Sequence, residues 1–273
     1  MGSNDHPSQG GSSGTSGVAV VAVVAAAAVV VAAGVTGFLV LSDDGGTDAK
    51  DAKPEASASA SPSENPRAAG DEDGPVIPGW KVVARPGSDV RYDVPPDWDI
   101  RPGDWRSYVA DDADEEEIPL VGFGGVATLK EEWCTSDDDQ DGTLGSTALA
   151  NVGTRVERGA RNTEEAARDN ADLWVYGKYT QPDKDKVETG EAEEFTTASG
   201  LKGHRVTAAS SGVDKPGKCA TDGKAVTFAF KNSKNDFASW TFVGAKGVPD
   251  EVPDATIDKI LSTVRLAEPA KPS

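Results

Sequence analysis

Two cysteines in this sequence have a spacing that bears on their chemistry. Cys134 and Cys219 are the only cysteines and lie 85 positions apart. A redox-active pair usually occurs as Cys-x-x-Cys, where neighbouring groups lower the thiol pKa. An even number of distant cysteines in an exported domain is instead typical of structural disulfides. We therefore predict a structural disulfide between Cys134 and Cys219.

A single histidine is the ready general base of the C-terminal part of the chain. His204 is the only histidine between residues 77 and 267, and imidazole is the side chain best suited to move protons near neutral pH. It alternates with Val206 and Ala208, which places it on the apolar face of a strand. A Ser-His-Asp hydrolase of the common type would also need a G-x-S-x-G elbow, and residues 77–267 contain none. A hydrogen-bonded sheet histidine is the favoured interpretation.

An acidic loop resembles the start of a calcium site. Asp137, Asp139 and Asp141 precede a glycine in the pattern D-x-D-x-D-G, in which alternate carboxylates can converge on one hard cation. An EF-hand also needs Glu at the twelfth position, and Ala148 stands there. The chain is rich in acids throughout, so a solvated loop is favoured and we predict no metal. A calcium-stabilised adhesion module remains an alternative.

Cofactor and nucleic-acid binding are disfavoured by local context and by charge. Gly122, Gly124 and Ala127 match G-x-G-x-x-A, but a dinucleotide site needs a helix directly afterwards and the following residues predict none. The 273 residues carry 46 acidic and 27 basic side chains, a net charge of −19. Nucleic acids require clustered positive charge. We therefore predict no cofactor and no nucleic-acid partner.

The N-terminal quarter contains a segment long enough to cross a bilayer. After a polar tail (residues 1–17), the run from Val18 to Leu41 has 24 residues without a charge. A helix of that length spans about 36 Å, against a hydrocarbon core of about 30 Å. The run is longer than the apolar part of a signal peptide, and no basic residue precedes it. We predict an uncleaved transmembrane helix.

Orientation and the next segment follow from charge and composition. Lys50 and Lys53 follow the helix and would by themselves favour a C-terminal domain inside the cell. A long domain translocates largely regardless of charge, and its two cysteines fit an oxidising compartment, so we predict an extracytoplasmic domain. Residues 42–76 are rich in Ala, Ser, Pro and acids and predict a disordered linker. Residues 268–273 predict a short tail.

Residues 77–267 predict one α+β domain. Val90, Tyr92 and Val94 alternate with charged residues, as in a half-buried strand. Two further strands are predicted around Val226, Phe228 and Phe230 and around Ala238, Trp240 and Phe242. Other predicted strands lie within 80–85, 118–129, 148–158, 194–198 and 204–209. The short connections predict an antiparallel sheet of six to eight strands.

Two segments carry helical spacing and would cover this sheet. Asn162 is a predicted N-cap, with Glu165 three residues later and an apolar stripe that ends near Tyr179. Asp254 precedes apolar residues at i, i+3, i+4 and i+7 from Ile257. Each helix has an apolar face that needs a sheet to pack on.

Several short motifs are similar to a group of envelope proteins. They are PGW at 78–80, YDVPPDW at 92–98, WVYGKY at 174–179 and the closing IDKILSTVRL. Together with the anchor and linker, they resemble the extracellular domain of actinobacterial single-pass membrane proteins of unknown function. More distantly, the pattern is similar to envelope lipoproteins with a PsbP-like sandwich, which carry a lipidated cysteine in place of a protein anchor. The resemblance implies location and fold.

These observations predict a cell-membrane protein that presents a binding domain outside the cell. The membrane is its first partner, through the N-terminal helix, and an envelope ligand or protein partner is left unidentified. The domain is predicted to be non-enzymatic because no complete catalytic set is recognisable. An envelope hydrolase that uses a carboxylate pair or His204 is the alternative from a different class.

Overall fold

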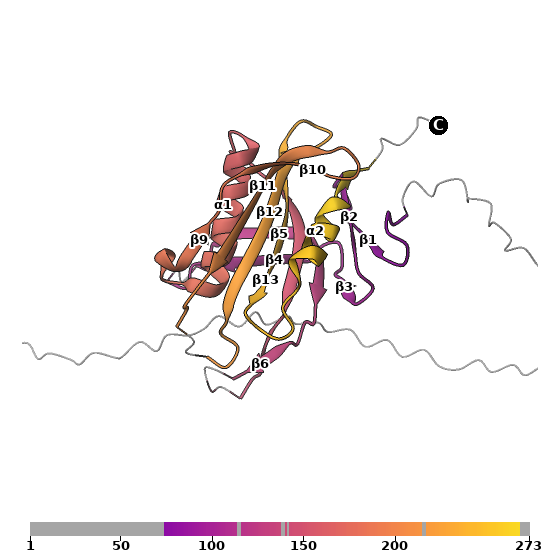
Figure 1. Ribbon diagram of the computed structural model, residues 1–273. Coiled ribbons are helices and arrows are strands. Elements are labelled where there is room, and N and C mark those ends of the chain that lie inside the picture. Colours follow the sequence, from indigo (N-terminus) through magenta and orange to yellow (C-terminus); the bar gives the residue numbers. More distant parts are fainter. Residues whose placement is uncertain (1–73, 114–115, 138–139, 141, 215–216, 268–273) are drawn as a thin grey trace, which may run out of the picture. The chain divides into compact units, whose positions relative to one another are not determined.

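The computed structural model describes residues 74–113, 116–137, 140, 142–214 and 217–267 (Figure 1). These residues form an α+β sandwich built on antiparallel sheets. The predicted fold class is therefore confirmed in its coarse form. The predicted transmembrane helix at 18–41 lies outside the described residues, and within those residues no helix has the length and apolar character needed to cross a bilayer.

The largest sheet has nine strands in the described residues. Its main path runs β10–β11–β12–β13–β8–β5–β3, with β4 also paired to β5 and β9 to β11. Its strands are β3 (Trp98–Ile100), β4 (Arg106–Ala110), β5 (Pro119–Leu129), β8 (Ala150–Val156), β9 (Val187–Thr189), β10 (Glu193–Thr196), β11 (Lys202–Ser210), β12 (Asp222–Lys231) and β13 (Phe237–Lys246).

Two smaller sheets complete the strands. One contains β1 (Lys81–Ala84), β2 (Val90–Val94) and β14 (Arg265–Leu266), in the order β1–β2–β14. The other is the hairpin of β6 (Cys134–Ser136) and β7 (Gly145–Thr147). The described strands outnumber the predicted six to eight, because strands of two to five residues are too short to show alternation.

The central strands are buried on both faces, and each face has its own apolar cluster. One cluster joins Phe228, Phe230, Trp240 and Phe242 of the sheet to β1, β2 and helix α2. The other joins small sheet residues, among them Ala208 and Ala225, to helix α1. The predicted facing of β12 and β13 is thus confirmed. Figure 1 shows the two helices on opposite sides of these strands.

Helix α1 (Thr163–Val175) begins where the sequence predicts. The Asn162 side chain accepts a hydrogen bond from the Glu165 backbone N–H at 2.8 Å, as in an N-cap. The α-helix ends at Val175, and a π-helical turn, η1 (Tyr176–Thr180), continues it. A short 3₁₀ turn, η2 (Lys184–Lys186), leads into β9.

Helix α2 (Asp254–Ser262) packs Ile257, Ile260 and Leu261 into the core, as their spacing predicts. Asp254 is the first helical residue and makes no cap, since Pro253 takes the N-cap position. The predicted packing of both helices on a sheet is confirmed.

Two details differ from expectation at the N-terminal edge of the domain. Asp93, which the alternation of β2 places on the polar face, is fully buried. Its carboxylate accepts hydrogen bonds from the backbone N–H groups of Val76 and Ile77 and from Arg265. Composition predicts that Val76 belongs to the linker, but its hydrogen bond to Asp93 ties it to the domain.

Candidate functional site

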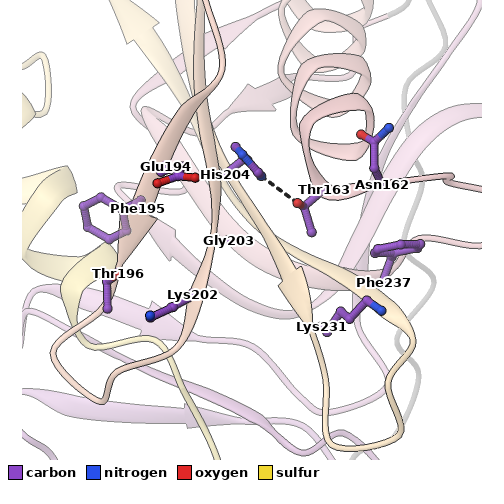
Figure 2. Close-up of a pocket in the computed structure, with 10 residues that line it drawn as sticks. All are labelled: Asn162, Thr163, Glu194, Phe195, Thr196, Lys202, Gly203, His204, Lys231 and Phe237. Carbon is purple, nitrogen blue, oxygen red and sulfur yellow. Dashed lines mark hydrogen bonds between the residues drawn. The ribbon is translucent and has the colours of Figure 1, made fainter.

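A groove of about 640 Å³ lies at one end of the nine-stranded sheet (Figure 2). Its lining comes from the start of α1, from β10 and β11, and from the end of β12 and the start of β13. The lining residues are Asn162, Thr163, Glu194, Phe195, Thr196, Lys202, Gly203, His204, Lys231 and Phe237. We call this cavity the α1 groove.

Strand register places four of these residues in one row across the sheet. Thr196 pairs with Lys202, and Lys231 pairs with Phe237. Lys202 and Lys231 each stand one position beyond the last recorded pair of β11 and β12, Gly203 with Phe230, and therefore lie opposite each other. The row faces the α1 side, because Val206 and Ala229, at even spacing from the two lysines, both belong to the α1 cluster.

Helix α1 leaves this row uncovered, because its first turn lies over the next part of the sheet and does not extend to the row. The first turn of the helix, at Thr163, lies over His204, which is two positions further along β11 than Lys202. The helix N-terminus itself offers little to a ligand, since Asn162 already accepts from the Glu165 amide. The last row of the sheet is therefore the floor of the groove.

Both ring nitrogens of His204 lie close to side chains of the first turn of α1. The Thr163 Oγ1 and His204 Nδ1 atoms share a hydrogen bond of 2.7 Å, and His204 Nε2 lies 3.4 Å from Glu164 Oε1. The imidazole is 23% exposed and the Glu164 side chain 63% exposed. The predicted position of His204 on the apolar face with Val206 and Ala208 agrees with the α1 cluster. A hydroxyl, an imidazole and a carboxylate thus meet, but the carboxylate is hydrated.

Two ammonium groups and one aromatic ring give the groove its binding chemistry. Lys202 and Lys231 are exposed, and neither forms an ion pair with a described residue. The Lys231 ammonium lies 5.3 Å from the centre of the Phe237 ring. Such a surface can accept an anionic group beside a ring. Phe195 also lines the groove, but its ring stacks edge-on against Phe228 in the cluster on the opposite face of the sheet, with ring centres 5.5 Å apart.

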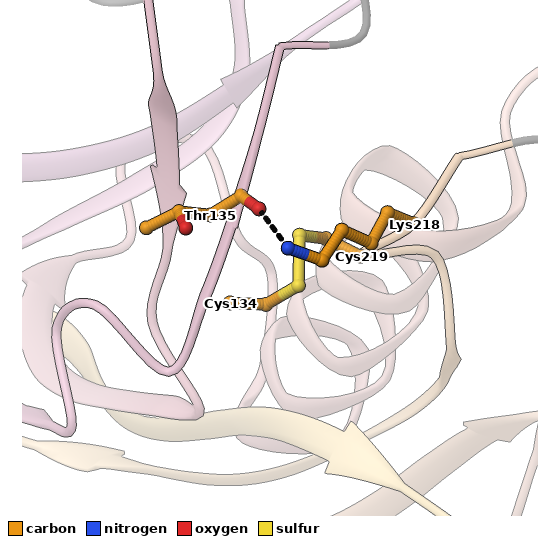
Figure 3. Close-up of a disulfide and its surroundings, with 4 residues drawn as sticks. All are labelled: Cys134, Thr135, Lys218 and Cys219. Carbon is orange, nitrogen blue, oxygen red and sulfur yellow. Dashed lines mark hydrogen bonds between the residues drawn. A yellow bond between two sulfur atoms is a disulfide. The ribbon is translucent and has the colours of Figure 1, made fainter.

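The predicted disulfide is present (Figure 3). It joins Cys134 of β6 to Cys219 in the loop before β12, with Cα atoms 5.6 Å apart. The Lys218 ammonium donates to the Thr135 carbonyl at 2.9 Å beside it. The bond therefore attaches the β6–β7 hairpin to the central sheet.

The predicted calcium loop is only partly described. Asp137 accepts a hydrogen bond from the Gly142 backbone N–H at 3.2 Å, whereas Asp139 and Asp141 lie outside the described residues. Within the described ranges no three acidic, histidine or cysteine side chains are grouped to hold a metal. Gly122, Gly124 and Ala127 all lie inside β5, so no helix follows them directly.

Lys178 in the π-helical turn is an unusual charged group outside the groove. Its ammonium lies 5.6 Å from the centre of the Tyr179 ring, and no ion pair joins it to a described residue. Burial lowers the pKa of Lys178 from 10.5 to about 8. The residue keeps some exposed surface, so solvent relieves part of this penalty.

Replacing Lys178 with Met should stabilise the domain by about 1–2 kcal/mol at pH 7, because the folded chain no longer buries a cation. Below pH 8 both folded and unfolded wild-type chains hold the proton. Between about pH 8 and 10.5 only the unfolded chain holds it, so wild-type stability rises and the advantage of Lys178→Met shrinks. Urea unfolding at pH 7 and 9.5 measures this. Lys130→Met, which removes an exposed partner of Asp250, is the control and should show no such pH dependence.

Comparison with known proteins places the domain in a family. The family model for the domain of unknown function DUF8017 matches residues 73–269. No curated protein matches the chain. A solved structure of the Saccharomyces cerevisiae Ran-binding protein Mog1p is similar at 14% identity and a TM-score of 0.37, covering 69% of this chain and 95% of that one. The chain belongs to the DUF8017 family.

Proposed function

We propose that this protein is a single-pass membrane protein that presents a non-enzymatic binding domain outside the cell, with the α1 groove as its ligand site. The single observation that supports binding there is the uncovered row, in which the Lys202 and Lys231 ammonium groups form no ion pair with a described residue and Lys231 lies beside the Phe237 ring. The ligand we propose carries a carboxylate or phosphate group attached to a ring.

The location part of this proposal rests on the sequence. The apolar run at 18–41, the acidic linker and the motif resemblance to actinobacterial and PsbP-like envelope proteins support it. The disulfide fits an oxidising compartment. Protease added to intact cells should remove the domain, and protection until the cells are broken would contradict an extracytoplasmic location.

Binding in the groove can be tested with 4-fluorobenzoate, a soluble ring-bearing anion, by ¹⁹F NMR titration of the full chain in detergent. The double variant Lys202→Gln/Lys231→Gln should bind about tenfold more weakly, since two charge-assisted contacts with an exposed anion are lost. Fluoroacetate, which lacks the ring, should bind more weakly than 4-fluorobenzoate.

The matched control for this titration is Lys184→Gln/Lys186→Gln, which removes the same charge from η2. It should leave the affinity unchanged. Equal weakening by both double variants would mean that only net charge matters and that the groove is not the site. Circular dichroism of each variant establishes that the fold is retained.

A hydrolase is the second candidate, favoured by the hydrogen bond between Thr163 and His204 and by the proximity of Glu164. These groups follow the order hydroxyl, imidazole, carboxylate of a catalytic triad. The exposure of Glu164 argues against it, because a hydrated carboxylate orients the imidazole weakly. Hydrolysis of 4-nitrophenyl acetate that is lost in Thr163→Ala would replace the non-enzymatic proposal.

A further inference from the structure

A second cavity, of about 330 Å³, lies where the β1–β2 turn, the end of β8 and the β12–β13 turn meet. It shares no lining residue with the α1 groove. Its charged lining consists of three cations and two carboxylates: Arg85, Arg155, Lys234, Asp89 and Asp236. We call it the Arg85 cavity.

Most of these charges already have partners or are open to solvent. Arg155 Nε lies 3.3 Å from a carboxylate oxygen of Glu157. The Asp89 carboxylate accepts the Ser233 backbone N–H at 2.7 Å, and this interaction helps to lower the pKa of Asp89 below its usual range despite partial burial. Lys234 and Asp236 are exposed. The lining therefore leaves one cation to be explained.

That cation is Arg85, which is partly buried and whose guanidinium has no hydrogen bond or ion pair with a described residue. Its Cβ atom lies against β5 at Gly125, where an added Cβ would come within 3.2 Å of it. Burial, and secondly the charge of Arg106, lower the pKa of the Arg85 guanidinium. In a protein of net charge −19, an unpaired guanidinium held beside another cation is unexpected unless an anion joins it.

We propose that the Arg85 cavity binds a small oxyanion, the carboxylate or phosphate group of a soluble molecule, with Arg85 as its main ligand. The planar guanidinium fork can donate two parallel hydrogen bonds to such a group. Ser88 lines the same cavity and its hydroxyl accepts from the Val90 N–H, which leaves its O–H free to donate to the anion.

The test is thermal unfolding of the full chain, followed by tryptophan fluorescence, in sodium phosphate or sodium acetate against sodium chloride at equal ionic strength. Raising a bound anion from its dissociation constant to tenfold above it should raise the midpoint by about 2–4 °C in a domain of this size. Because phosphate stabilises many proteins without binding a site, the comparison that decides is between variants. Arg85→Gln should lose the anion-dependent shift, and Arg85→Lys should keep only part of it.

Three controls make each outcome decisive. Arg168→Gln removes the same charge from α1 and should keep the full shift, as should Lys202→Gln/Lys231→Gln in the α1 groove. In chloride, Arg85→Gln should melt no lower than wild type, since it removes an unpaired charge. A larger shift in phosphate than in acetate identifies a phosphate ligand, and the reverse a carboxylate. A shift that persists in Arg85→Gln, or no shift in either anion, overturns the proposal.

Discussion

Replacing Arg265 with Met should lower the free energy of unfolding by about 3–5 kcal/mol, because it leaves the Asp93 carboxylate buried without its countercharge. Arg265 Nη1 donates to Asp93 Oδ1 at 2.8 Å, and the Asp93 side chain is 0% exposed. The second carboxylate oxygen, Oδ2, accepts the Val76 N–H at 2.6 Å. The same arginine also donates to the Gly74 carbonyl, so its loss frees both ends of the domain.

A double variant separates the charge from the packing. Asp93→Asn/Arg265→Met removes both ions and keeps a side chain that can still accept from Val76, so it should be more stable than Arg265→Met alone. Arg161→Met breaks an exposed ion pair with Glu165 and should change stability by less than about 1 kcal/mol. Urea unfolding followed by tryptophan fluorescence measures all three, since every tryptophan lies between residues 80 and 240. A loss for Arg265→Met no larger than for Arg161→Met would contradict this account.

The same pair explains where sequence reasoning about the fold stops. The alternation of β2 predicts correctly that Val90, Tyr92 and Val94 face the core. It cannot predict that Asp93 is buried too, because the groups that cover it lie 172 positions away at Arg265 and 17 positions away at Val76. A local sequence pattern predicts which face of a strand packs on the core. Whether the other face is also buried depends on residues that the tertiary fold brings to it.

Elements whose signals are local were predicted well. The Asn162 cap and the apolar stripe predict α1 to within one residue at its start, because capping is a contact within four residues. No local sequence signal marks the π-helical turn at Tyr176–Thr180, so the residue pattern predicts that the α-helix simply continues there. Short strands such as β9 and β14 are fixed by their neighbours rather than by their own residues.

The candidate sites depend on juxtapositions that one sequence does not encode locally. His204 stood out by its chemistry, but its partner Thr163 is 41 positions away on another element. Lys202 and Lys231 meet through the register of β11 and β12, and they form a groove only because α1 begins beyond them. The Arg85 guanidinium stands out because it is partly buried with no partner among the described residues, and burial and pairing are properties of the folded chain.

The disulfide carries the other large expected effect. Cys134→Ala/Cys219→Ala should lower the free energy of unfolding by about 3–5 kcal/mol, because a bond across 85 residues removes much of the conformational entropy of the unfolded chain. Reduction of the wild-type protein should give the same loss without altering a residue. The unfolded chain also becomes more extended once the bond is gone, so the dependence of stability on urea should steepen.

The double cysteine variant and reduction of the wild-type protein together show whether the disulfide stabilises the domain by constraining the unfolded chain or through a local contact in the folded one. If the bond acted only by holding the β6–β7 hairpin, its removal would cost less than about 1 kcal/mol and the urea dependence would stay unchanged, since that hairpin is a two-stranded sheet. Lys218→Met removes the neighbouring bond to the Thr135 carbonyl and keeps the disulfide, so it reports that local contribution alone. A large loss with a steeper urea dependence in the double variant, beside a small loss in Lys218→Met, means that stability depends on a bond formed where thiols are oxidised. The proposed extracytoplasmic location would then be the compartment in which the domain is most stable.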